Sequence, residues 1–186
     1  MKSYDIFLSV VYVLNDNRVN DDLNRLYKIL KNTVQVLSPI VADYEIIIVD
    51  NVPNKNNSIS LLKKLTNDKE LPNLQVYILN KTVNENIAAC VGLDKSLGDF
   101  VAILNPFLDD ISFLPKMLDK AINGFDIVIA YNKNKYVKSF FYRFARKIFN
   151  NLYKFLNRAT INKDIFPYRL FSRQITNQIL QDPYPE

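Results

Sequence analysis

The sequence predicts an α/β fold in which a mostly parallel β-sheet is covered by helices on both faces. Short apolar runs of strand length alternate along the chain with longer segments of helical period, the pattern of such a sheet. Two of the runs, IIIV within EIIIV and FVAIL, are continuously apolar, as expected for strands buried on both faces. With 186 residues, 48% of them hydrophobic, the chain is expected to form a single domain over residues 1–186.

Nine segments are assigned to strands and helices from these patterns. The predicted strands are apolar runs at Asp5–Val13, Tyr44–Asp50, Leu74–Leu79, Phe100–Leu104 and Phe125–Tyr131. The predicted helices are Asp21–Leu37, Ser58–Leu65, Glu85–Leu97 and Ser112–Ile122. The first helix has one apolar stripe, formed by Leu23, Leu26, Ile29, Leu30, Val34 and Leu37. This stripe is expected to pack on the sheet.

The chain contains no histidine and one cysteine. The lack of histidine excludes Ser-His-Asp and Cys-His catalytic arrangements and histidine-ligated zinc. Cys90 has no partner for an internal disulfide, so it is expected to be a small buried residue. Any catalysis must use carboxylates, amines, guanidinium groups, hydroxyls or a bound cation.

The net charge of +5 is unevenly distributed. Residues Ile127–Lys163 contain nine basic and no acidic side chains, so this segment carries +9 and the rest of the chain −4. Within it, residues 133–158 place apolar side chains at helical spacing between Lys and Arg. This pattern is typical of a basic amphipathic helix in the headgroup layer of an anionic membrane, while a core helix or the interface of a homo-oligomer fits it equally well. Nucleic acid is not expected as a partner, because no nucleic-acid-binding motif is present.

The chain is expected to be cytoplasmic. Its apolar runs are far shorter than the roughly 18 residues that cross a bilayer, and its first residues have a strand pattern rather than a signal-peptide pattern. If the basic segment contacts lipid, the protein is expected to be peripheral on the inner face of the membrane.

Polar side chains follow the predicted strands at their carboxyl ends. Asn15 follows the first strand, Asp50 and Asn51 follow the core of the second, and Asn105 follows the fourth. Ligands of open parallel sheets bind beyond these ends, so the four side chains are candidates to bind a base, a ribose or a phosphate. Each alone also fits a turn or a helix cap, and their joint placement favours a ligand site.

Four segments together carry a resemblance to a known family. They are LSVVYVLND, YEIIIVDN, NENIAACVGLDKSLGDFVAIL and DIFPYRLFSR. Their order and spacing, from about Ser9 to Ile179, resemble the family 2 glycosyltransferases of GT-A fold. The closest branch is the one that transfers a sugar from a nucleotide to a polyprenyl or dolichyl phosphate. The resemblance implies a nucleotide sugar as donor, with Asn15, Asp50, Asn51 and Asn105 on the nucleotide.

The metal motif departs from the family pattern. Where the family has Asp-x-Asp, this chain has Asn105, Pro106 and Phe107, so no metal ligand is assigned. Asn is a weak ligand for a hard cation and Phe is none, whereas Asp109 and Asp110 are candidate substitutes. The resemblance implies Mg²⁺ or Mn²⁺ if the protein is active. The alternative is a catalytically inactive relative that serves as a nucleotide-, membrane- or partner-binding scaffold.

On the acceptor side, the resemblance assigns five positions. Asp164 matches the family's acidic residue and is implied as a general base or a positioning group, although a turn in which it pairs with Arg169 is equally open. Arg143, Arg146, Arg169 and Arg173 are expected to bind the acceptor phosphate, because guanidinium offers paired donors that match phosphate.

The resemblance implies transfer of a sugar to a polyprenyl phosphate or to a growing surface polysaccharide. The chain ends at Glu186, earlier than catalytic domains of the family usually do. It is therefore expected to be a C-terminally truncated piece or to have a reduced acceptor side.

Overall fold

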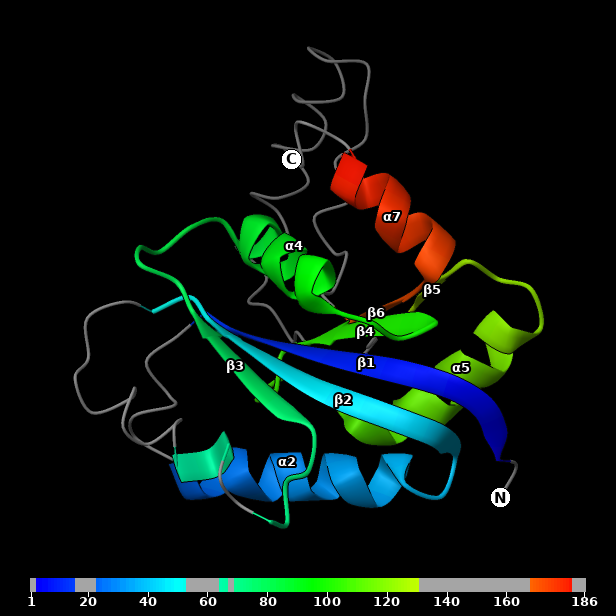
Figure 1. Ribbon diagram of the computed structural model, residues 1–186, viewed down its shortest axis with the longest axis horizontal. Helices are drawn as coiled ribbons and strands as arrows, with labels where there is room; N and C mark the ends of the chain where they lie inside the picture. Colours follow the sequence, from blue (N-terminus) through cyan, green and yellow to red (C-terminus); the bar gives the residue numbers. More distant parts are fainter. Residues whose placement is uncertain (1–2, 16–22, 53–63, 67–68, 131–167, 182–186) are drawn as a thin grey trace, which may run out of the picture. The chain divides into compact units, whose positions relative to one another are not determined.

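The computed structural model describes residues 3–15, 23–52, 64–66, 69–130 and 168–181. These residues form a six-stranded sheet in the order β3-β2-β1-β4-β6-β5, with helices against it (Figure 1). The strands are β1 (Tyr4–Leu14), β2 (Val41–Asp50), β3 (Leu74–Ile78), β4 (Phe100–Leu104), β5 (Ile127–Ile129) and β6 (Arg169–Ser172). The helices are α2 (Leu23–Leu37), α4 (Glu85–Lys95), the 3-10 turn η1 (Ile111–Phe113), α5 (Leu114–Ile122) and α7 (Arg173–Gln181).

The sheet is mostly parallel, as predicted. β1 pairs in parallel with β2 and β4, and β2 pairs in parallel with β3, whereas β6 is antiparallel to both β4 and β5. Leu14 is opposite Asp50, and Tyr12 is opposite Leu104. The carboxyl ends of β1, β2 and β4 therefore share one edge of the sheet. We call this edge, formed by residues 14–15, 50–51 and 104–105, the carboxyl rim.

Both faces of the central strands are buried, which confirms the prediction made from the continuously apolar runs. Val10 and Tyr12 of β1 belong to the core on the side of α2 and α5, and Val11 and Val13 belong to the core on the side of α4 and α7 (Figure 1). Such alternation is the period of a β-strand with two buried faces. Each of these side chains is at most 2% exposed, and full burial of such a side chain contributes about 1.5–3 kcal/mol.

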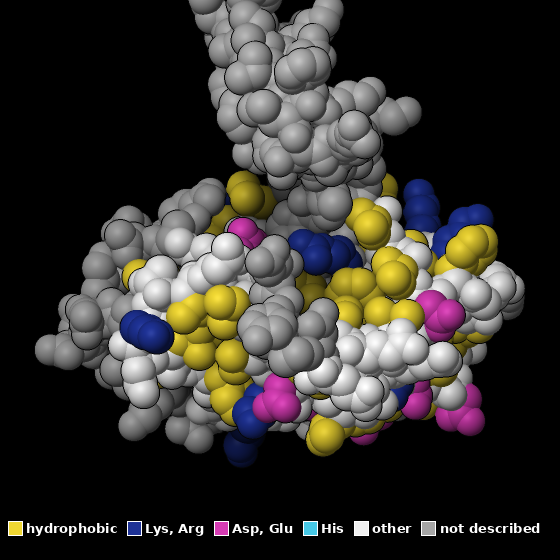
Figure 2. Space-filling view, turned by 90° about the horizontal axis from the view of Figure 1, so that it is seen from above, with side chains coloured by type: hydrophobic (Ala, Val, Ile, Leu, Met, Phe, Trp, Pro, Cys, Tyr) yellow, Lys and Arg dark blue, Asp and Glu magenta, His cyan; other side chains and the backbone are white. Residues whose placement is uncertain are grey.

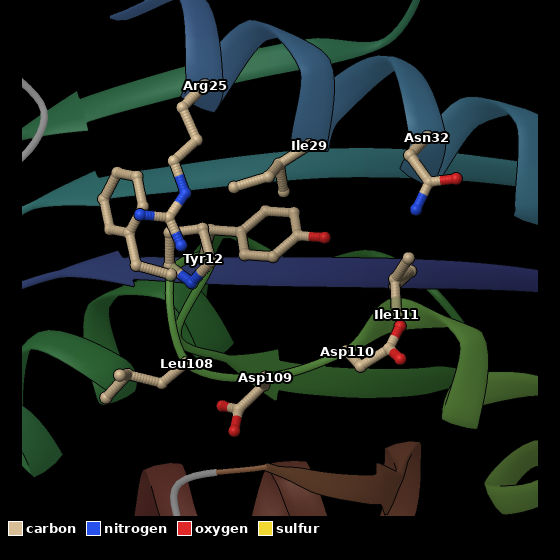
Figure 3. Close-up of a pocket in the computed structure, with 10 residues that line it drawn as sticks. Tyr12, Arg25, Ile29, Asn32, Leu108, Asp109, Asp110 and Ile111 are labelled. Atoms are coloured by element: carbon tan, nitrogen blue, oxygen red, sulfur yellow. The ribbon is translucent and has the colours of Figure 1, made fainter. Parts of the chain in front are cut away.

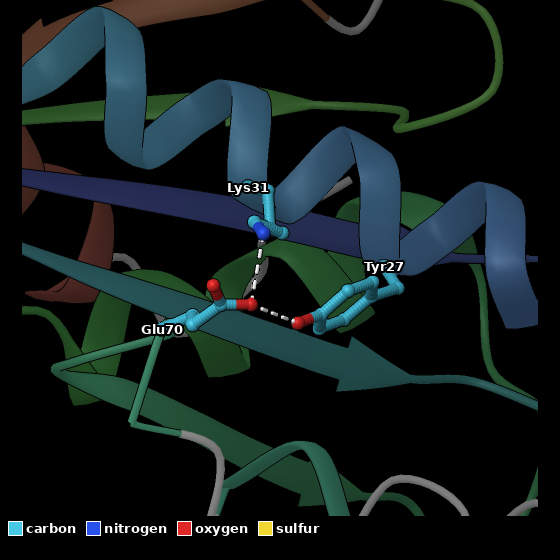
Figure 4. Close-up of polar contacts among 3 residues, drawn as sticks. All are labelled: Tyr27, Lys31 and Glu70. Carbon is cyan, nitrogen blue, oxygen red and sulfur yellow. Dashed lines mark hydrogen bonds and ion pairs between the residues drawn. The ribbon is translucent and has the colours of Figure 1, made fainter.

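Helix α2 has the predicted amphipathic pattern. Leu26, Leu30 and Leu37 are fully buried against the sheet. On its outer side, Tyr27 Oη and Lys31 Nζ both donate hydrogen bonds to the Glu70 carboxylate, at 2.6 and 2.8 Å (Figure 4). These bonds lower the pKa of Glu70 and tie α2 to the segment that precedes β3.

The remaining helices have recognisable starts. Asn84 caps α4, because its Oδ1 accepts a hydrogen bond from the Asn86 N–H at 2.8 Å. The segment Ser112–Ile122 was expected to be one helix, but it is divided into η1 and α5. Asp110 caps η1, and the proline in the first turn of α5 suits a helix start. Figure 2 shows the face with α4 and α7, where apolar and charged side chains are interspersed.

Several predicted elements differ from the structure. The strand expected at Phe125–Tyr131 is limited to β5. Strand β6 and helix α7 were not predicted. β6 gives a weak signal in the sequence, because it is only 4 residues long and begins and ends in polar side chains. Cys90 is half-buried on α4 rather than buried, and burial raises the pKa of its thiol. Most of the helix expected at Ser58–Leu65 lies outside the described residues.

Residues 133–158 lie outside the described part of the chain, so the single domain and the basic amphipathic helix stay predictions. Among the residues that are described, no helix is long and apolar enough to span a bilayer.

The edge of the sheet opposite the carboxyl rim is held by a buried carboxylate. Glu45, which is 3% exposed, accepts hydrogen bonds from Ser9 Oγ (2.6 Å), the Leu97 N–H (2.7 Å) and Gln75 Nε2 (2.9 Å). These bonds fix the loop between α4 and β4 against β1 and β2.

We expect Glu45→Ala to lower the free energy of unfolding by about 3 kcal/mol, because buried donors would lose their acceptor. Urea denaturation followed by circular dichroism measures this change. Glu70→Ala, which removes an exposed carboxylate and its two bonds to α2, is the control and should lower the midpoint much less than Glu45→Ala. Equal midpoints for the two variants would contradict a structural role for Glu45.

Candidate functional site at the carboxyl rim

The structure brings the four predicted nucleotide-binding residues to the carboxyl rim. Asn15 follows β1, Asp50 ends β2, Asn51 follows it, and Asn105 follows β4. Asn51 Nδ2 donates to Asn15 Oδ1 at 2.9 Å, so two of the four side chains are in direct contact. Their placement at one edge follows from the parallel register of the strands, as expected from the sequence.

Asn51 has a structural part in this arrangement. Its Nδ2 donates to the Val83 carbonyl at 2.8 Å, and its Oδ1 accepts from the Val83 N–H at 2.8 Å. The side chain therefore holds the segment before α4 against the rim. Val83 contributes through its backbone, so its side-chain type gave no signal of this contact in the sequence.

Asn15 keeps an unsatisfied donor. Its Oδ1 accepts from Asn51, but its Nδ2 is buried and has no hydrogen-bond partner among the described residues. A buried polar group without a partner costs about 1–3 kcal/mol, so such groups are uncommon outside sites that bind a ligand or water. Asn15 Nδ2 is therefore a candidate donor to a ligand.

Asp50 is a buried carboxylate at the end of β2. It is 3% exposed, and one oxygen accepts the Val52 N–H at 3.0 Å. Burial raises the pKa of Asp50 above its ordinary value of 3.8, and the bond from Val52 opposes this shift. No described residue donates to the second oxygen. A ligand hydroxyl or N–H that donates to this oxygen would stabilise its charge.

Asn105 and the carboxylates after it fold the loop that follows β4. Asn105 Oδ1 accepts the Phe107 N–H at 3.0 Å, and the Asn105 N–H donates to Asp109 Oδ2 at 2.8 Å. Asp110 Oδ1 accepts the Ser112 N–H at 2.9 Å. All three side chains are thus engaged in local turns and caps.

The loop after β4 offers few ligands to a metal ion. Phe107 has no ligand atom, and one oxygen each of Asn105, Asp109 and Asp110 accepts a backbone N–H group. In the described part of the chain, no group of three acidic or cysteine side chains could hold a cation. Asp109 and Asp110 line one cavity, and their role as substitute metal ligands stays a prediction.

A cavity of about 270 Å³ lies between α2 and the loop after β4 (Figure 3). Tyr12 and Ile29 line it on the side of the sheet and α2, and Asp109 and Asp110 line it on the side of the loop. The Arg25 guanidinium carbon lies 5.4 Å from the centre of the Phe107 ring. Arg25 was not predicted as a site residue, because in the sequence it is one polar residue among several outside the apolar stripe of the helix.

The two arginines of β6 and α7 lie at opposite edges of the sheet. Arg169 pairs with Ile103 near the rim, its NH2 group is 3.4 Å from Asn86 Oδ1, and its buried Nε has no hydrogen-bond partner in the described part of the protein. Arg173 instead donates from Nε to the Gly98 carbonyl at 2.8 Å, beside the amino end of β4. The antiparallel strand thus carries the two arginines to opposite edges of the sheet, and their roles toward an acceptor phosphate stay predictions.

The other predicted acceptor residues, Arg143, Arg146 and Asp164, lie outside the described residues. Their roles stay predictions.

Comparison with known proteins agrees with this geometry. The family model for Glycosyl transferase family 2 matches residues 17–180. The chain belongs to this family. It is 30% identical over 184 residues to an uncharacterized glycosyltransferase of Synechocystis sp.. This alignment covers 96% of this chain and 54% of that protein. It is 26% identical over 141 residues to the undecaprenyl-phosphate 4-deoxy-4-formamido-L-arabinose transferase of Pseudomonas fluorescens, covering 75% of this chain and 40% of that protein.

Solved structures confirm the GT-A fold of this family 2 member. A mannosyltransferase from Pyrobaculum calidifontis in complex with GDP-Man and Mn²⁺ superposes with a TM-score of 0.58 at 13% identity, covering 95% of this chain and 47% of that chain. Mannosyl-3-phosphoglycerate synthase from Rubrobacter xylanophilus superposes with a TM-score of 0.56 at 14% identity, covering 91% and 54%. The chain spans about half the length of the curated relatives it matches.

Proposed function

We propose that this family 2 member binds a nucleoside-diphosphate sugar at the carboxyl rim and takes part in transferring the sugar to a phosphate-bearing lipid acceptor, such as a polyprenyl phosphate. The observation that carries the proposal is the pair formed by Asn15 and Asp50, which provides a buried unsatisfied donor and a buried carboxylate at the ends of neighbouring strands. Together they suit the hydroxyl, N–H and carbonyl groups of a nucleoside.

The chemistry of the proposed reaction requires positive charge. An acceptor phosphate oxygen would attack the anomeric carbon while the bond from that carbon to the diphosphate breaks, and the nucleoside diphosphate would leave with the bonding electrons. An acceptor phosphate is already ionised near neutral pH, so it needs little help from a base. Charge that develops on the departing diphosphate needs nearby cations or N–H donors. Arg169 lies near the rim, and its buried Nε has no hydrogen-bond partner among the described residues, so it is a candidate donor to a phosphate.

A lipid-phosphate acceptor is supported by the name of the Pseudomonas fluorescens relative and by the basic composition of residues 133–158. Arg143, Arg146 and Asp164 are the proposed acceptor-side residues. Contact of this segment with an anionic membrane belongs to the same proposal and is tested by sedimentation with anionic and neutral vesicles.

The proposal is tested by calorimetric titration with uridine and guanosine diphosphates and their sugars. We expect Asn15→Asp to weaken binding by about 10-fold, because the variant keeps the oxygen that accepts from Asn51 but lacks the Nδ2 donor and adds a negative charge near the diphosphate. Gln35→Glu adds the same charge at an exposed position late in α2 and serves as the matched control.

Binding by the wild-type chain and the control, with weaker binding by Asn15→Asp, supports the proposal. Failure of the wild-type chain to bind any nucleoside diphosphate would contradict it. Binding without transfer or hydrolysis of any nucleotide sugar would instead favour the second candidate, an inactive scaffold. This candidate is considered because Asn105 and Phe107 replace two metal-ligating carboxylates.

A further inference from the structure

Buried polar atoms without a hydrogen-bond partner gather at one edge of the sheet. In the part of the chain that the structure describes, these atoms are Asn15 Nδ2, Tyr168 Oη and Arg169 Nε. Asn15 belongs to the carboxyl rim, and Arg169 is opposite Ile103, one residue before the end of β4. The same register places Tyr168 beside Leu104 of the rim. Because such atoms are rare in folded proteins, their gathering at one edge indicates a ligand that contacts several strands.

Tyr168 and Arg169 are consecutive residues, so their side chains lie on opposite faces of the sheet. Tyr168 is 3% exposed and belongs to the core on the side of α2 and α5. Arg169 extends on the other side, where its NH2 group is 3.4 Å from Asn86 Oδ1 in the first turn of α4 (Figure 1). A ligand that lies over this edge can therefore contact one of the two residues on each face.

The α4 side of the edge offers N–H donors. Asn51 holds the segment before α4 against the rim through its two hydrogen bonds to the Val83 backbone. Asn51 also donates to Asn15, so the same contacts bring the free Nδ2 of Asn15 to the side where Arg169 meets α4. A guanidinium group with an unpaired Nε–H and an amide N–H together suit the oxygens of a diphosphate.

The α2 side of the edge has a different chemical character. Asp109 and Asp110 lie on the loop after β4, and Asp109 Oδ2 accepts the Asn105 N–H at the rim. Burial raises the pKa of Tyr168, and its neighbours Tyr12 and the two carboxylates raise it further, so the hydroxyl stays protonated and is able to donate. The carboxylates disfavour a phosphate on this side. A sugar hydroxyl, in contrast, can accept from Tyr168 and donate to a carboxylate.

We propose that a nucleoside-diphosphate sugar crosses this edge, with its diphosphate at Arg169 on the α4 side and its sugar at Tyr168 on the α2 side. Tyr168 Oη donates to a hydroxyl oxygen of the sugar and contributes to the choice of sugar. Arg169 binds the diphosphate of the donor rather than the phosphate of the acceptor. This inference rests on the proposed function, because it assumes a nucleotide sugar at the rim.

Calorimetric titration of the full chain separates the two contacts, because a free nucleoside diphosphate lacks the sugar. The probes are uridine and guanosine diphosphates, UDP-glucose, UDP-N-acetylglucosamine and GDP-mannose. Tyr168→Phe is expected to weaken binding of a sugar nucleotide about 10-fold and to leave the affinity for its nucleoside diphosphate unchanged. Arg169→Gln is expected to weaken binding of both about 10-fold. Tyr44→Phe, the same change near the amino end of β2, is the matched control and should alter neither affinity.

Melting curves without ligand distinguish a binding role of Tyr168 from a structural one. Phenylalanine fills the same space without the unpartnered hydroxyl, so the melting temperature of Tyr168→Phe should equal or exceed that of the wild type. A lower melting temperature would contradict the inference, because it would show that the hydroxyl has a structural partner.

Two results of the titrations would overturn the inference and leave the proposed function intact. One is an unchanged affinity of Tyr168→Phe for every sugar nucleotide, as expected of a hydroxyl that binds only water. The other is an equal loss for a sugar nucleotide and its nucleoside diphosphate in this variant. Failure of the wild-type chain to bind any of the probes would overturn both the inference and the proposed function.

Discussion

Gly98→Ala is expected to destabilise the protein by about 4 kcal/mol or more, the largest effect that we anticipate for a single substitution. A Cβ atom at Gly98 would lie 2.6 Å from the Ser9 backbone nitrogen and 2.8 Å from the Phe7 carbonyl oxygen. Both contacts are with backbone atoms of β1, which cannot move without breaking the sheet. The Gly98 N–H also donates to Ser9 Oγ at 2.8 Å, so any shift would disturb the hydrogen bonds of Glu45 as well.

Gly124→Ala provides the matched control for this prediction. Gly124 has φ of +102° and no atom within 4 Å of a Cβ at that position, so the cost is conformational and should be about 1 kcal/mol. Thermal and urea denaturation of the two variants measure the difference. A Gly98→Ala variant as stable as Gly124→Ala would show that β1 and the loop before β4 are not in such close contact.

Asp50→Asn is expected to have opposite effects on ligand binding and on stability. Affinity for a nucleoside diphosphate should fall by about 10- to 100-fold, because a charged acceptor at the rim is lost. The folded protein should become more stable at neutral pH. Burial raises the pKa of Asp50, so keeping the carboxylate ionised costs stability, and Asn can still accept the Val52 N–H.

The pH dependence gives this prediction a definite sign. A carboxyl group whose pKa is raised by folding stabilises the folded state while it is protonated, and this contribution is lost as pH rises from the ordinary value of 3.8 through the raised value. Melting temperatures of Asp50→Asn and wild type should therefore be close below pH 3.8 and should diverge in favour of the variant at neutral pH. A variant less stable than wild type at neutral pH would contradict this account of Asp50.

The mostly parallel, doubly covered sheet and the rim could be predicted from the sequence because both depend on local patterns. Runs such as FVAIL require two covered faces, and the polar residues that end such runs meet at one edge wherever the strands are parallel. The four rim residues were found in this way. Their separate structural roles could not be predicted, because the hydrogen bonds of Asn51 to the Val83 backbone depend on how two distant segments pack.

The antiparallel part of the sheet escaped prediction for a related reason. Arg169 and Arg173 are four residues apart, so their sequence spacing alone allows a shared phosphate. The direction of β6 separates them, and only pairing of Arg169 with Ile103 and of Ser172 with Phe100 reveals that direction. Contact between Arg25 and Phe107, which are far apart in sequence, likewise depends on tertiary packing.

Chemical-shift mapping of the ¹⁵N-labelled chain during titration with uridine and guanosine diphosphates tests the central claim most directly. If the carboxyl rim binds the nucleotide, the backbone amides of Asn15, Asp50, Asn51 and Asn105 should shift with a common saturation curve, and those of Gly98 and Ser172 at the opposite edge should not. Shifts concentrated at the opposite edge, or none at saturating nucleotide, would contradict the account.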